Sequence, residues 1–367
     1  MESLLIKQQF STGERTLYPG ELYICDDKVK QTIQKAFNEY AKQTGKTGIF
    51  KSIEFFNIDS IFKKLNKDSD VKNLLIMRYG GAGDIMALSS IIDYFDVNTH
   101  FVTQKKYFPV FDWFETKPKL YDVSDRLFTN FKRSDAFTRF NDWYRFHVEG
   151  IIEKGHKRNW FELFFEFIEE PNPGIEFCRP QLRTKRINNN ESNIQRLSNE
   201  KPSLLICNKA TAMMRTCYAS DIVKCLPDSI KEKYTIFVHE SNLAKDEIIK
   251  DVILIGNTNL ETYLLDLFDS DMVISVDTGA LHFREGIEKP AIGLYNSFTT
   301  DSRTKYYQYT KSFDLTSNCE LQPCFIHEKL KIKHCPMGEA GMYAAPCFDM
   351  KKNKTLEKQL SEIFNYL

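Results

Sequence analysis

Residues 271–295, DMVISVDTGALHFREGIEKPAIGLY, form the stretch that decides the fold. Residues 272–276 are an apolar, β-branched run, which is typical of a buried strand. A polar turn follows at 277–279, then a predicted helix from 280 to about 288, and then a second apolar strand at 291–295. Strand, glycine turn, helix and strand make a βαβ unit. The N-terminus of its helix is a natural anion site, because the first helical amides have no partner inside the helix.

The composition is that of a globular protein, and a chain of 367 residues is long enough for about two domains. Hydrophobic residues make up 42% and charged residues 27%, which excludes a disordered or fibrous chain. Lys+Arg and Asp+Glu number 50 each, so no overall field attracts nucleic acid or membrane. We expect a cytoplasmic protein, because the sequence shows neither a signal-peptide pattern nor an apolar run of membrane-spanning length.

A second strand–loop–helix unit begins near residue 72. A short buried strand is expected at 72–77 and a helix at 85–95, with the loop RYGGAGD between them. The loop glycines Gly80, Gly81 and Gly83 allow a sharp turn and a close approach to a ligand. The loop is neither a dinucleotide fingerprint nor a Walker phosphate loop, because Met86 replaces the third glycine of the first and no Gly-Lys-Ser/Thr follows.

Asp84 ends this loop and has two interpretations. As the N-cap of the next helix it would accept hydrogen bonds from free amides, and spacing alone favours this role. As a general base it would lie at the carboxyl edge of a parallel sheet, where such sheets bind ligands. The two roles are compatible only if one carboxylate oxygen stays free.

The second half of the chain is expected to hold a parallel sheet, because strand and helix patterns alternate. It follows a polar, Asn-rich segment, 183–201, that we interpret as an interdomain linker. Lys209 and Arg215 follow its first strand and fit phosphate binding as well as they fit ordinary surface charge. The strands are expected at 203–207, 234–239 and 252–255, and the helices at 220–225, 244–250 and 260–268.

Two further regions carry weaker patterns. Residues 1–70 predict a short strand pair at 16–24 and an amphipathic helix at 28–44, and we interpret them as an appended module. Basic and aromatic residues alternate between 131 and 160, a combination that can bind nucleic acid. An aromatic core with a solvated charged face is the favoured alternative, because acidic residues dilute the patch.

Four of the nine cysteines, Cys319, Cys324, Cys335 and Cys347, lie within one short segment that also contains proline and glycine. Four thiolates can bind a tetrahedral metal, zinc or iron, and they would leave no open position, so the metal would be structural. His327 and His334 could each replace one thiol. The alternative is four unrelated free thiols.

Two segments together resemble the lipopolysaccharide heptosyltransferases. Residues 74–90, LLIMRYGGAGDIMALSS, resemble their N-terminal signature, and 270–295 resemble their C-terminal signature with Asp-Thr-Gly-x-x-His. The resemblance covers about 72–310. It implies the α/β GT-B architecture, two Rossmann-like halves facing across a cleft, with the donor nucleotide-sugar on the C-terminal half. It also implies an inverting glycosyltransferase whose catalysis needs no metal.

The resemblance also implies roles for individual residues. Asp84 would be the base that deprotonates the acceptor hydroxyl, with His282 as a less favoured alternative. Asp277 would hold the sugar or brace the turn, and Arg215, followed by Lys209, would be the family's basic residue, although Thr216-Cys217-Tyr218 replaces the usual Trp-Pro. The donor would be bound by Gly81, Gly83, Lys209, Arg215, Asp277, Thr278, Gly279, Ala280 and His282. The cysteine cluster resembles the metal finger of the autotransporter heptosyltransferases, a protein-modifying branch.

The sequence therefore predicts a glycosyltransferase that moves a hexose, heptose or pentose from a nucleoside-diphosphate sugar to a glycan or protein hydroxyl. One alternative acceptor is a hydroxymethylated DNA base, and another hypothesis is a non-catalytic assembly protein of the same fold. A homo-oligomer is possible. We expect an N-terminal module at 1–70, an acceptor domain at 71–195, a donor domain at 196–315, a cysteine finger at 316–350 and a C-terminal helix at 351–367.

Overall fold

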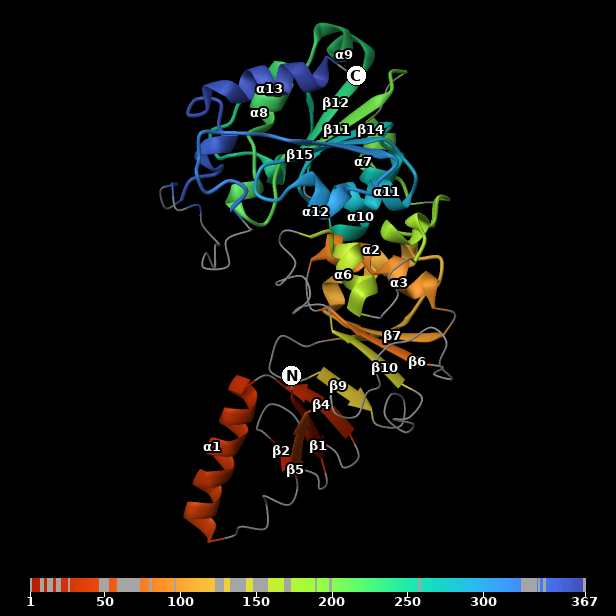
Figure 1. The fold of residues 1–367 in the computed structure, drawn as a ribbon, viewed down its shortest axis with the longest axis vertical. Helices are drawn as coiled ribbons and strands as arrows, with labels where there is room; N and C mark the ends of the chain where they lie inside the picture. The colour runs from red at the N-terminus through yellow and green to blue at the C-terminus, as the bar shows by residue number, and fades with distance from the viewer. Residues whose placement is uncertain are drawn as a thin grey trace.

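A computed structural model gives the architecture of the chain. Along its long axis it stacks an antiparallel sheet, a four-stranded parallel sheet and a six-stranded parallel sheet (Figure 1). The structure describes residues 2–6, 10–11, 16–17, 21–25, 27–45, 53–57, 73–78, 81–95, 97–122, 129–132, 143–147, 158–167, 173–188, 190–197, 200–256, 259–324, 335, 337–338 and 341–365.

The N-terminal sheet is antiparallel and includes a strand from far along the chain. Its order is β5-β1-β4-β9, from β1 (Glu2–Ile6), β4 (Glu21–Cys25), β5 (Ile53–Asn57) and β9 (Thr129–Lys132). The strand pair predicted within 16–24 is wrong. The strand β3 (Thr16–Leu17) pairs with β2 (Phe10–Ser11), whereas β4 is held between β1 and β9, which offer it longer ladders.

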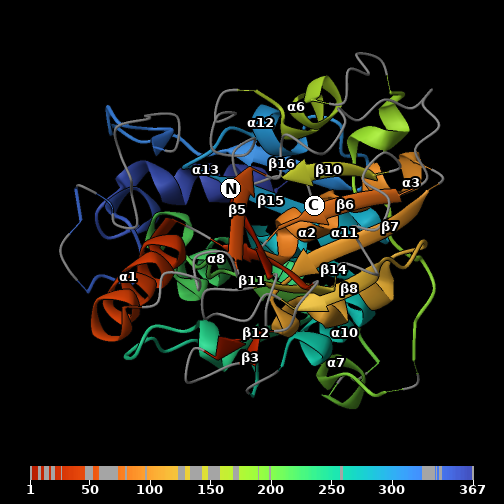
Figure 2. The same cartoon turned by 90° about the horizontal axis from the view of Figure 1, so that it is seen from below.

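The helix predicted at 28–44 is confirmed as α1 (Asp27–Thr44). Ile33 and Phe37 are buried because residues four apart lie on one face of a helix. In both views α1 lies on the opposite side of the molecule from β7 (Figures 1 and 2).

The middle sheet is entirely parallel, with the order β10-β6-β7-β8. The strand predicted at 72–77 is confirmed as β6. The chain order reverses between β6 and β10, and in open parallel sheets ligands bind beyond the carboxyl ends of the strands at such a point. The four strands are β6 (Asn73–Met77), β7 (Asn98–Thr103), β8 (Lys119–Asp122) and β10 (Trp143–His147).

The helix predicted at 85–95 is two helices, α2 (Ala82–Ala87) and α3 (Ser89–Tyr94). The Ser89 hydroxyl donates to the Met86 carbonyl at 2.6 Å, and the Ser90 hydroxyl donates to the Ala87 carbonyl at 2.9 Å. Serine hydroxyls that bond nearby carbonyls compete with the helical backbone bonds, which explains the break. The described residues of this half also form η3 (Lys105–Trp113), α6 (Trp160–Phe167) and η5 (Ile175–Cys178).

The third sheet has the order β13-β12-β11-β14-β15-β16, which is that of a doubly wound dinucleotide-binding fold. Its strands confirm the expected strands at 203–207, 234–239, 252–255, 272–276 and 291–295. The chain order reverses between β11 and β14. The six strands are β11 (Ser203–Cys207), β12 (Thr235–His239), β13 (Ile253–Ile255), β14 (Met272–Val276), β15 (Ala291–Tyr295) and β16 (Thr310–Asp314).

The helix predicted at 244–250 is wrong. The Glu247 carboxylate accepts from the Ser220 amide at 2.8 Å and from the Ala244 amide at 3.0 Å, which holds this segment as a loop. The other predicted helices of this half are confirmed. The helical elements here are α7 (Asn193–Leu197), η6 (Met213–Arg215), α8 (Ala219–Cys225), α9 (Asp228–Lys233), η7 (Glu240–Asn242), α10 (Leu260–Asp269), α11 (Gly279–Gly286), α12 (Thr300–Thr304), η9 (Pro346–Phe348) and α13 (Lys354–Phe364).

One hydrophobic core joins the two parallel-sheet halves. Trp113 of η3 packs on Phe268 of α10 and Phe283 of α11, with ring centroids 5.0 and 4.9 Å apart. A second core lies between the larger sheet and α8 and α13. The predicted α/β fold is confirmed, and the predicted domain boundaries stay a prediction. None of the described helices is long and apolar enough to span a membrane.

Candidate functional site

The two glycine loops that the sequence singles out meet at the junction of the halves. A Cβ placed on Gly83 would lie 2.6 Å from His282 Cδ2 and 2.9 Å from Gly279 Cα. Only glycine at these positions allows α2 and α11 to approach so closely. The loop after β6 and the turn after β14 therefore share one site, and Gly80 lies outside the described residues.

Asp84 belongs to the first turn of α2, and the N-cap interpretation is wrong. The helix begins at Ala82, and its cap is Gly81, whose φ of +81° favours glycine. The Asp84 carboxylate instead forms an ion pair with Arg78. The Asp84 side chain is 22% exposed and the Arg78 side chain 13%. Gly81 also leaves room for that carboxylate, since a Cβ there would overlap it. The carboxylate is therefore oriented by a cation rather than used for capping.

The turn after β14 is fixed by hydroxyl groups. Thr278 is the N-cap of α11 and accepts from the Ala280 amide at 3.2 Å. The Thr278 hydroxyl also lies 2.9 Å from that of Ser275. These bonds hold the start of α11 in place, with Gly279 and Ala280 in its first turn, where helices attract anions.

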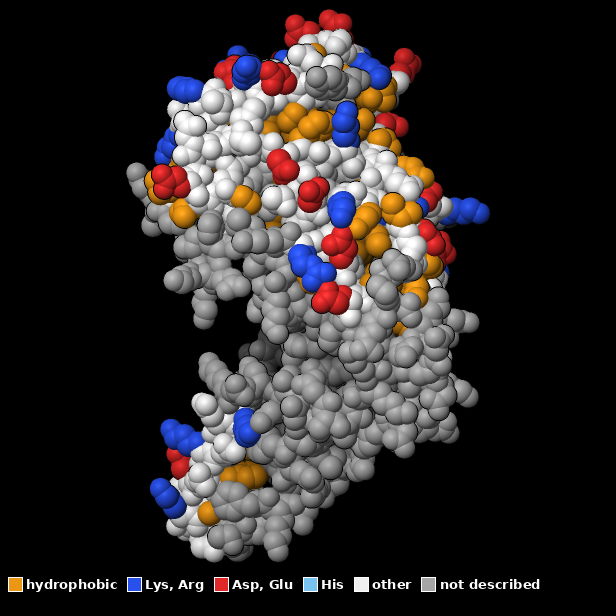
Figure 3. Space-filling view, viewed as in Figure 1, with side chains coloured by type: hydrophobic (Ala, Val, Ile, Leu, Met, Phe, Trp, Pro, Cys, Tyr) orange, Lys and Arg blue, Asp and Glu red, His pale blue; other side chains and the backbone are white. Residues whose placement is uncertain are grey.

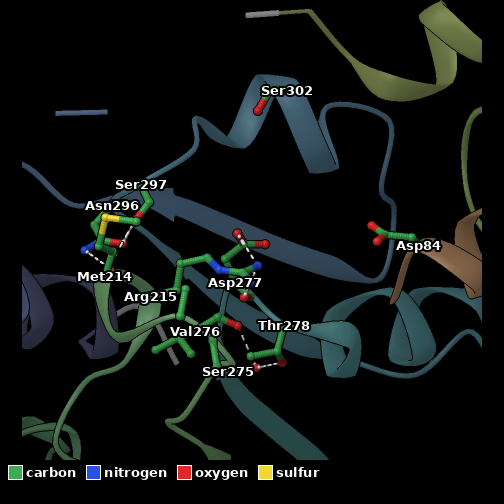
Figure 4. A network of polar contacts seen from close by, with 12 residues as sticks. Asp84, Met214, Arg215, Ser275, Val276, Asp277, Thr278, Asn296, Ser297 and Ser302 are labelled. Carbon is green, nitrogen blue, oxygen red and sulfur yellow. Dashed lines mark hydrogen bonds and ion pairs between the residues drawn. The ribbon is translucent and has the colours of Figure 1, made fainter. Parts of the chain in front are cut away.

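Arg215 reaches this turn from the loop after β11. Its Nη1 donates to the carbonyl and to the Oδ2 of Asp277, both at 3.2 Å, and Asp277 is buried. Asn296 and Ser297 donate to the Met214 carbonyl at 2.7 and 2.9 Å, which holds the turn that carries Arg215. Figure 4 shows Arg215 pointing at Asp277, with the Asp84 carboxylate facing them from the other half.

Lys209 is oriented differently from Arg215. Its Nζ donates to the Ser241 carbonyl at 2.7 Å and lies 5.9 Å from the centre of the Tyr343 ring. The structure thus places Lys209 against η7 and the segment before η9. Of the two predicted basic residues, Arg215 is the one that contacts the turn.

His282 lies in the first turn of α11 and is almost fully buried. Its Nδ1 is 2.6 Å from the Tyr307 hydroxyl, and its ring packs on Trp160 with centroids 4.7 Å apart. Burial lowers the pKa of His282 to about 4, and the cations Arg303 and Arg215 lower it too, against Asp277 and Asp84. His282 is therefore neutral at neutral pH.

Two residues of the site, Arg78 and Arg303, are not among the candidates that the sequence predicts. Arg78 follows the strand β6 directly in the sequence, at the start of the glycine loop. Arg303 of α12 is 5% exposed, and burial lowers its pKa while Asp277 and Asp84 act to raise it. A lone arginine in a polar segment gives no local sign of this burial.

His239, at the end of β12, is buried against Asp266, with Nε2 3.7 Å from the carboxylate. Burial lowers the pKa of His239 to about 4, so the two groups are not an ion pair at neutral pH.

The four clustered cysteines lie near one another. Cys324 and Cys335 pack with Met214 and Ala345, and Cys347 packs against this group. Burial raises the pKa of the Cys324 thiol to about 12, and the thiols of Cys347, Cys319 and Cys335 add to this shift. Among the described side chains, no group of three has the arrangement of a metal site. His327 and His334 lie outside the described residues.

The described surface of the C-terminal half carries acidic and basic side chains intermingled (Figure 3). Most of the basic and aromatic region at 131–160 lies outside the described residues, so the nucleic-acid interpretation stays a prediction.

Comparison with known proteins gives the family and the fold of the chain. The sequence pattern of glycosyltransferase family 9 (heptosyltransferase) matches residues 138–333, more than half of the chain. The structure is similar to the bacterial iron-containing dodecameric glycosyltransferase TibC from enterotoxigenic E. coli H10407, with 11% identity and a TM-score of 0.53. That match covers 82% of this chain and 78% of TibC.

A second similar structure is the dodecameric iron-containing heptosyltransferase TibC in complex with ADP-D-β-D-heptose. The identity is 10%, the TM-score is 0.51, and the match covers 85% of this chain and 82% of that one. Comparison with curated protein sequences gives no match. The fold is that of GT-B glycosyltransferases, as predicted, and the chain is a glycosyltransferase that belongs to family 9, the heptosyltransferase family.

Proposed function

We propose that this enzyme is an inverting transferase that moves a sugar from a nucleoside-diphosphate sugar to a hydroxyl group. The observation that carries the proposal is the contact between Gly83 and Gly279. It brings a carboxylate from one half to the anion-binding helix start of the other half. A glycosyl transfer needs both, because one substrate must lose a proton while the other releases a diphosphate.

Asp84 is the base in this mechanism. Its carboxylate takes the proton of the acceptor hydroxyl while that oxygen attacks the anomeric carbon of the donor. The bond from the anomeric carbon to the diphosphate oxygen breaks, and the diphosphate leaves with the bonding electrons. Arg78 keeps the carboxylate in place through its ion pair.

The leaving diphosphate binds at the start of α11. In this proposal the Gly279 amide, the Thr278 hydroxyl and the dipole of α11 stabilise the developing charge, while the Ala280 amide fixes the Thr278 hydroxyl, and Arg215 adds a cation that Asp277 orients. Gly81 and Gly83 line the site, and His282 supports α11 from inside. Lys209 has a smaller role than the sequence suggests, because it contacts Ser241 and Tyr343.

ADP-heptose is the donor to test first, because a similar structure contains it. The acceptor is a glycan or a protein hydroxyl. The similar TibC structures are iron-containing and dodecameric, so we propose a structural iron or zinc bound by Cys319, Cys324, Cys335 and Cys347, and a homo-oligomer. The cytoplasm is the proposed location.

Thermal unfolding with a panel of nucleotide sugars tests the proposal. A donor present at about 100 times its Kd should stabilise the folded protein by about 2.7 kcal/mol, and the free sugar should have no effect. Arg215→Met should abolish the shift, whereas Arg196→Met, at an exposed position of α7, should keep it. If no nucleotide sugar raises the melting temperature of the wild-type protein, the proposed donor class is wrong.

A further inference from the structure

Arg303 is a buried cation that packs against aromatic rings. It lies on α12 and is 5% exposed. The carbon at the centre of its guanidinium group lies 3.9 Å from the Phe298 ring centre and 4.8 Å from the Trp160 ring centre. Across the residues that the structure describes, its nitrogens make no hydrogen bond or ion pair. Its contacts are therefore with ring faces, and the donors at its edge remain available.

The surroundings of Arg303 belong to the proposed donor site. The carboxylates of Asp277 and Asp84 act electrostatically on its guanidinium group and raise its pKa, and Arg215 acts in the opposite direction. Trp160, which it stacks on, also packs on His282 in the first turn of α11. Arg303 thus packs on the same tryptophan as His282 of α11 and is within electrostatic reach of the Asp84 carboxylate.

The charges of this site do not balance. Asp84 is paired with Arg78, and Asp277 is paired with Arg215 at 3.2 Å. Arg303 is a third cation, for which neither of these two carboxylates serves as an ion-pair partner. The N-terminus of α11 adds partial positive charge. An isolated buried cation is strongly unfavourable, so the arrangement is suited to a ligand that brings more than one negative charge.

We propose that Arg303 is a direct ligand of the donor diphosphate and that it shares the leaving phosphate oxygens with Arg215. Its planar fork matches two oxygens of one phosphate, and the aromatic rings on its faces fix the direction of that fork. The assignment rests on the proposed function, because it takes the start of α11 as the diphosphate site. It adds a second arginine, from a different element, to that site.

Inorganic pyrophosphate is the probe, because it contains the diphosphate and neither nucleoside nor sugar. Its affinity is measured by calorimetry for the wild-type full chain, Arg303→Met and Arg303→Lys. Arg303→Met should weaken pyrophosphate binding by about 10-fold to 100-fold, as expected for a lost charged hydrogen-bonding partner. Arg303→Lys should restore only part of it, because lysine keeps the charge but loses the fork.

Lys305→Met is the matched control. Lys305 is two positions further along, carries the same charge, and pairs with Glu162 at 2.8 Å. This variant should bind pyrophosphate as the wild type does. Adenosine should bind all the variants with the same affinity, since a nucleoside offers no phosphate.

The stability of the Arg303→Met variant distinguishes a ligand-binding role of Arg303 from a purely structural one. In the absence of ligand, Arg303→Met should be at least as stable as the wild type, because an unpaired buried charge has been replaced by an apolar chain of similar length. If Arg303 only packs between Trp160 and Phe298, Arg303→Met should be less stable than the wild type and should bind pyrophosphate equally well. That result would overturn the assignment. If Arg303→Met does not fold, Arg303→Lys decides, and wild-type affinity in that variant would count against the inference.

Failure of the inference differs from failure of the proposed function. If the wild type binds pyrophosphate and ADP-heptose and Arg303→Met binds both equally well, Arg303 is not a ligand and the proposed function stands. If the wild type binds neither, the diphosphate site itself is wrong, and the Arg303 assignment is overturned with it.

Discussion

Gly83 and Gly279 lie back to back where the two halves of the chain meet. A Cβ on Gly83 would come within 2.9 Å of Gly279 Cα, and a Cβ on Gly279 would come within 3.0 Å of the Gly83 nitrogen. Both contacts are with backbone atoms, which cannot rotate away. The distance between the proposed base and the proposed diphosphate site is therefore set by two residues without side chains.

The first prediction concerns this contact. Gly83→Ala should destabilise the protein by about 1–3 kcal/mol, as overpacking of a tight contact does. It should also weaken donor binding, because α2 and α11 must move apart. Chemical denaturation and donor titration measure the two effects. Gly256→Ala is the control, because a Cβ there meets nothing within 4 Å, and equal effects of the two substitutions would contradict the account.

The second prediction concerns acid stability. The pKa of His239 is lowered from 6.5 to about 4 by burial, so between these values the unfolded chain takes up a proton that the folded chain does not. The contribution of His239 to the free energy of unfolding is therefore fully present above pH 6.5. It decreases on acidification, and the loss from this one group is about 2 kcal/mol at pH 5.

His282 should add a similar loss, since its pKa is also lowered to about 4. Denaturation of the wild type and of His239→Leu at pH 7 and pH 5 measures the difference. The comparison cancels the opposite contribution of Asp93, whose pKa burial raises to about 6. An identical pH dependence in both proteins would show that His239 is not held neutral.

The third prediction links the cysteine cluster to donor binding. Met214 packs with Cys324 and Cys335 and directly precedes Arg215. The purified protein should contain about one metal ion per chain, lost in Cys324→Ser/Cys335→Ser, which is the stoichiometry of a four-thiolate site. That variant should be less stable and should bind the donor more weakly, because the support of the Arg215 turn is lost.

Metal analysis and donor titration of the same samples check this. Cys178→Ser is the control, since Cys178 is buried in the core that joins the two halves. This substitution should affect neither metal content nor donor affinity. A protein that is free of metal yet as stable as the wild type would contradict the metal site.

The local elements of the site could be predicted because their signals are local. The strand at 272–276, the turn and the helix after it could all be predicted. A strand that is buried on both faces is rich in apolar, β-branched residues, and the turn contains a glycine. The sequence also predicts Asp84 as a site residue, but it places the start of the helix at Ile85, three residues too late. The helix begins at Ala82 because Gly81 adopts a positive φ as its N-cap, which sequence spacing does not reveal.

Contacts between segments that are far apart in the chain could not be predicted from the sequence. The burial of Arg303 depends on Trp160, which comes from the other half of the chain. The pairing of β9 with β4 likewise joins distant segments. In both cases the partner is selected by tertiary packing, which no local pattern of residues encodes.

The central claim is that Asp84 takes the proton of the acceptor. The most direct test is the turnover of Asp84→Asn with a donor that the wild type uses, alongside the donor affinity of both proteins. Asparagine keeps the shape of the side chain but cannot accept the proton, so turnover should fall by about 10²-fold to 10⁴-fold while donor affinity and melting temperature stay close to those of the wild type. Transfer by Asp84→Asn at the wild-type rate would show that another group is the base.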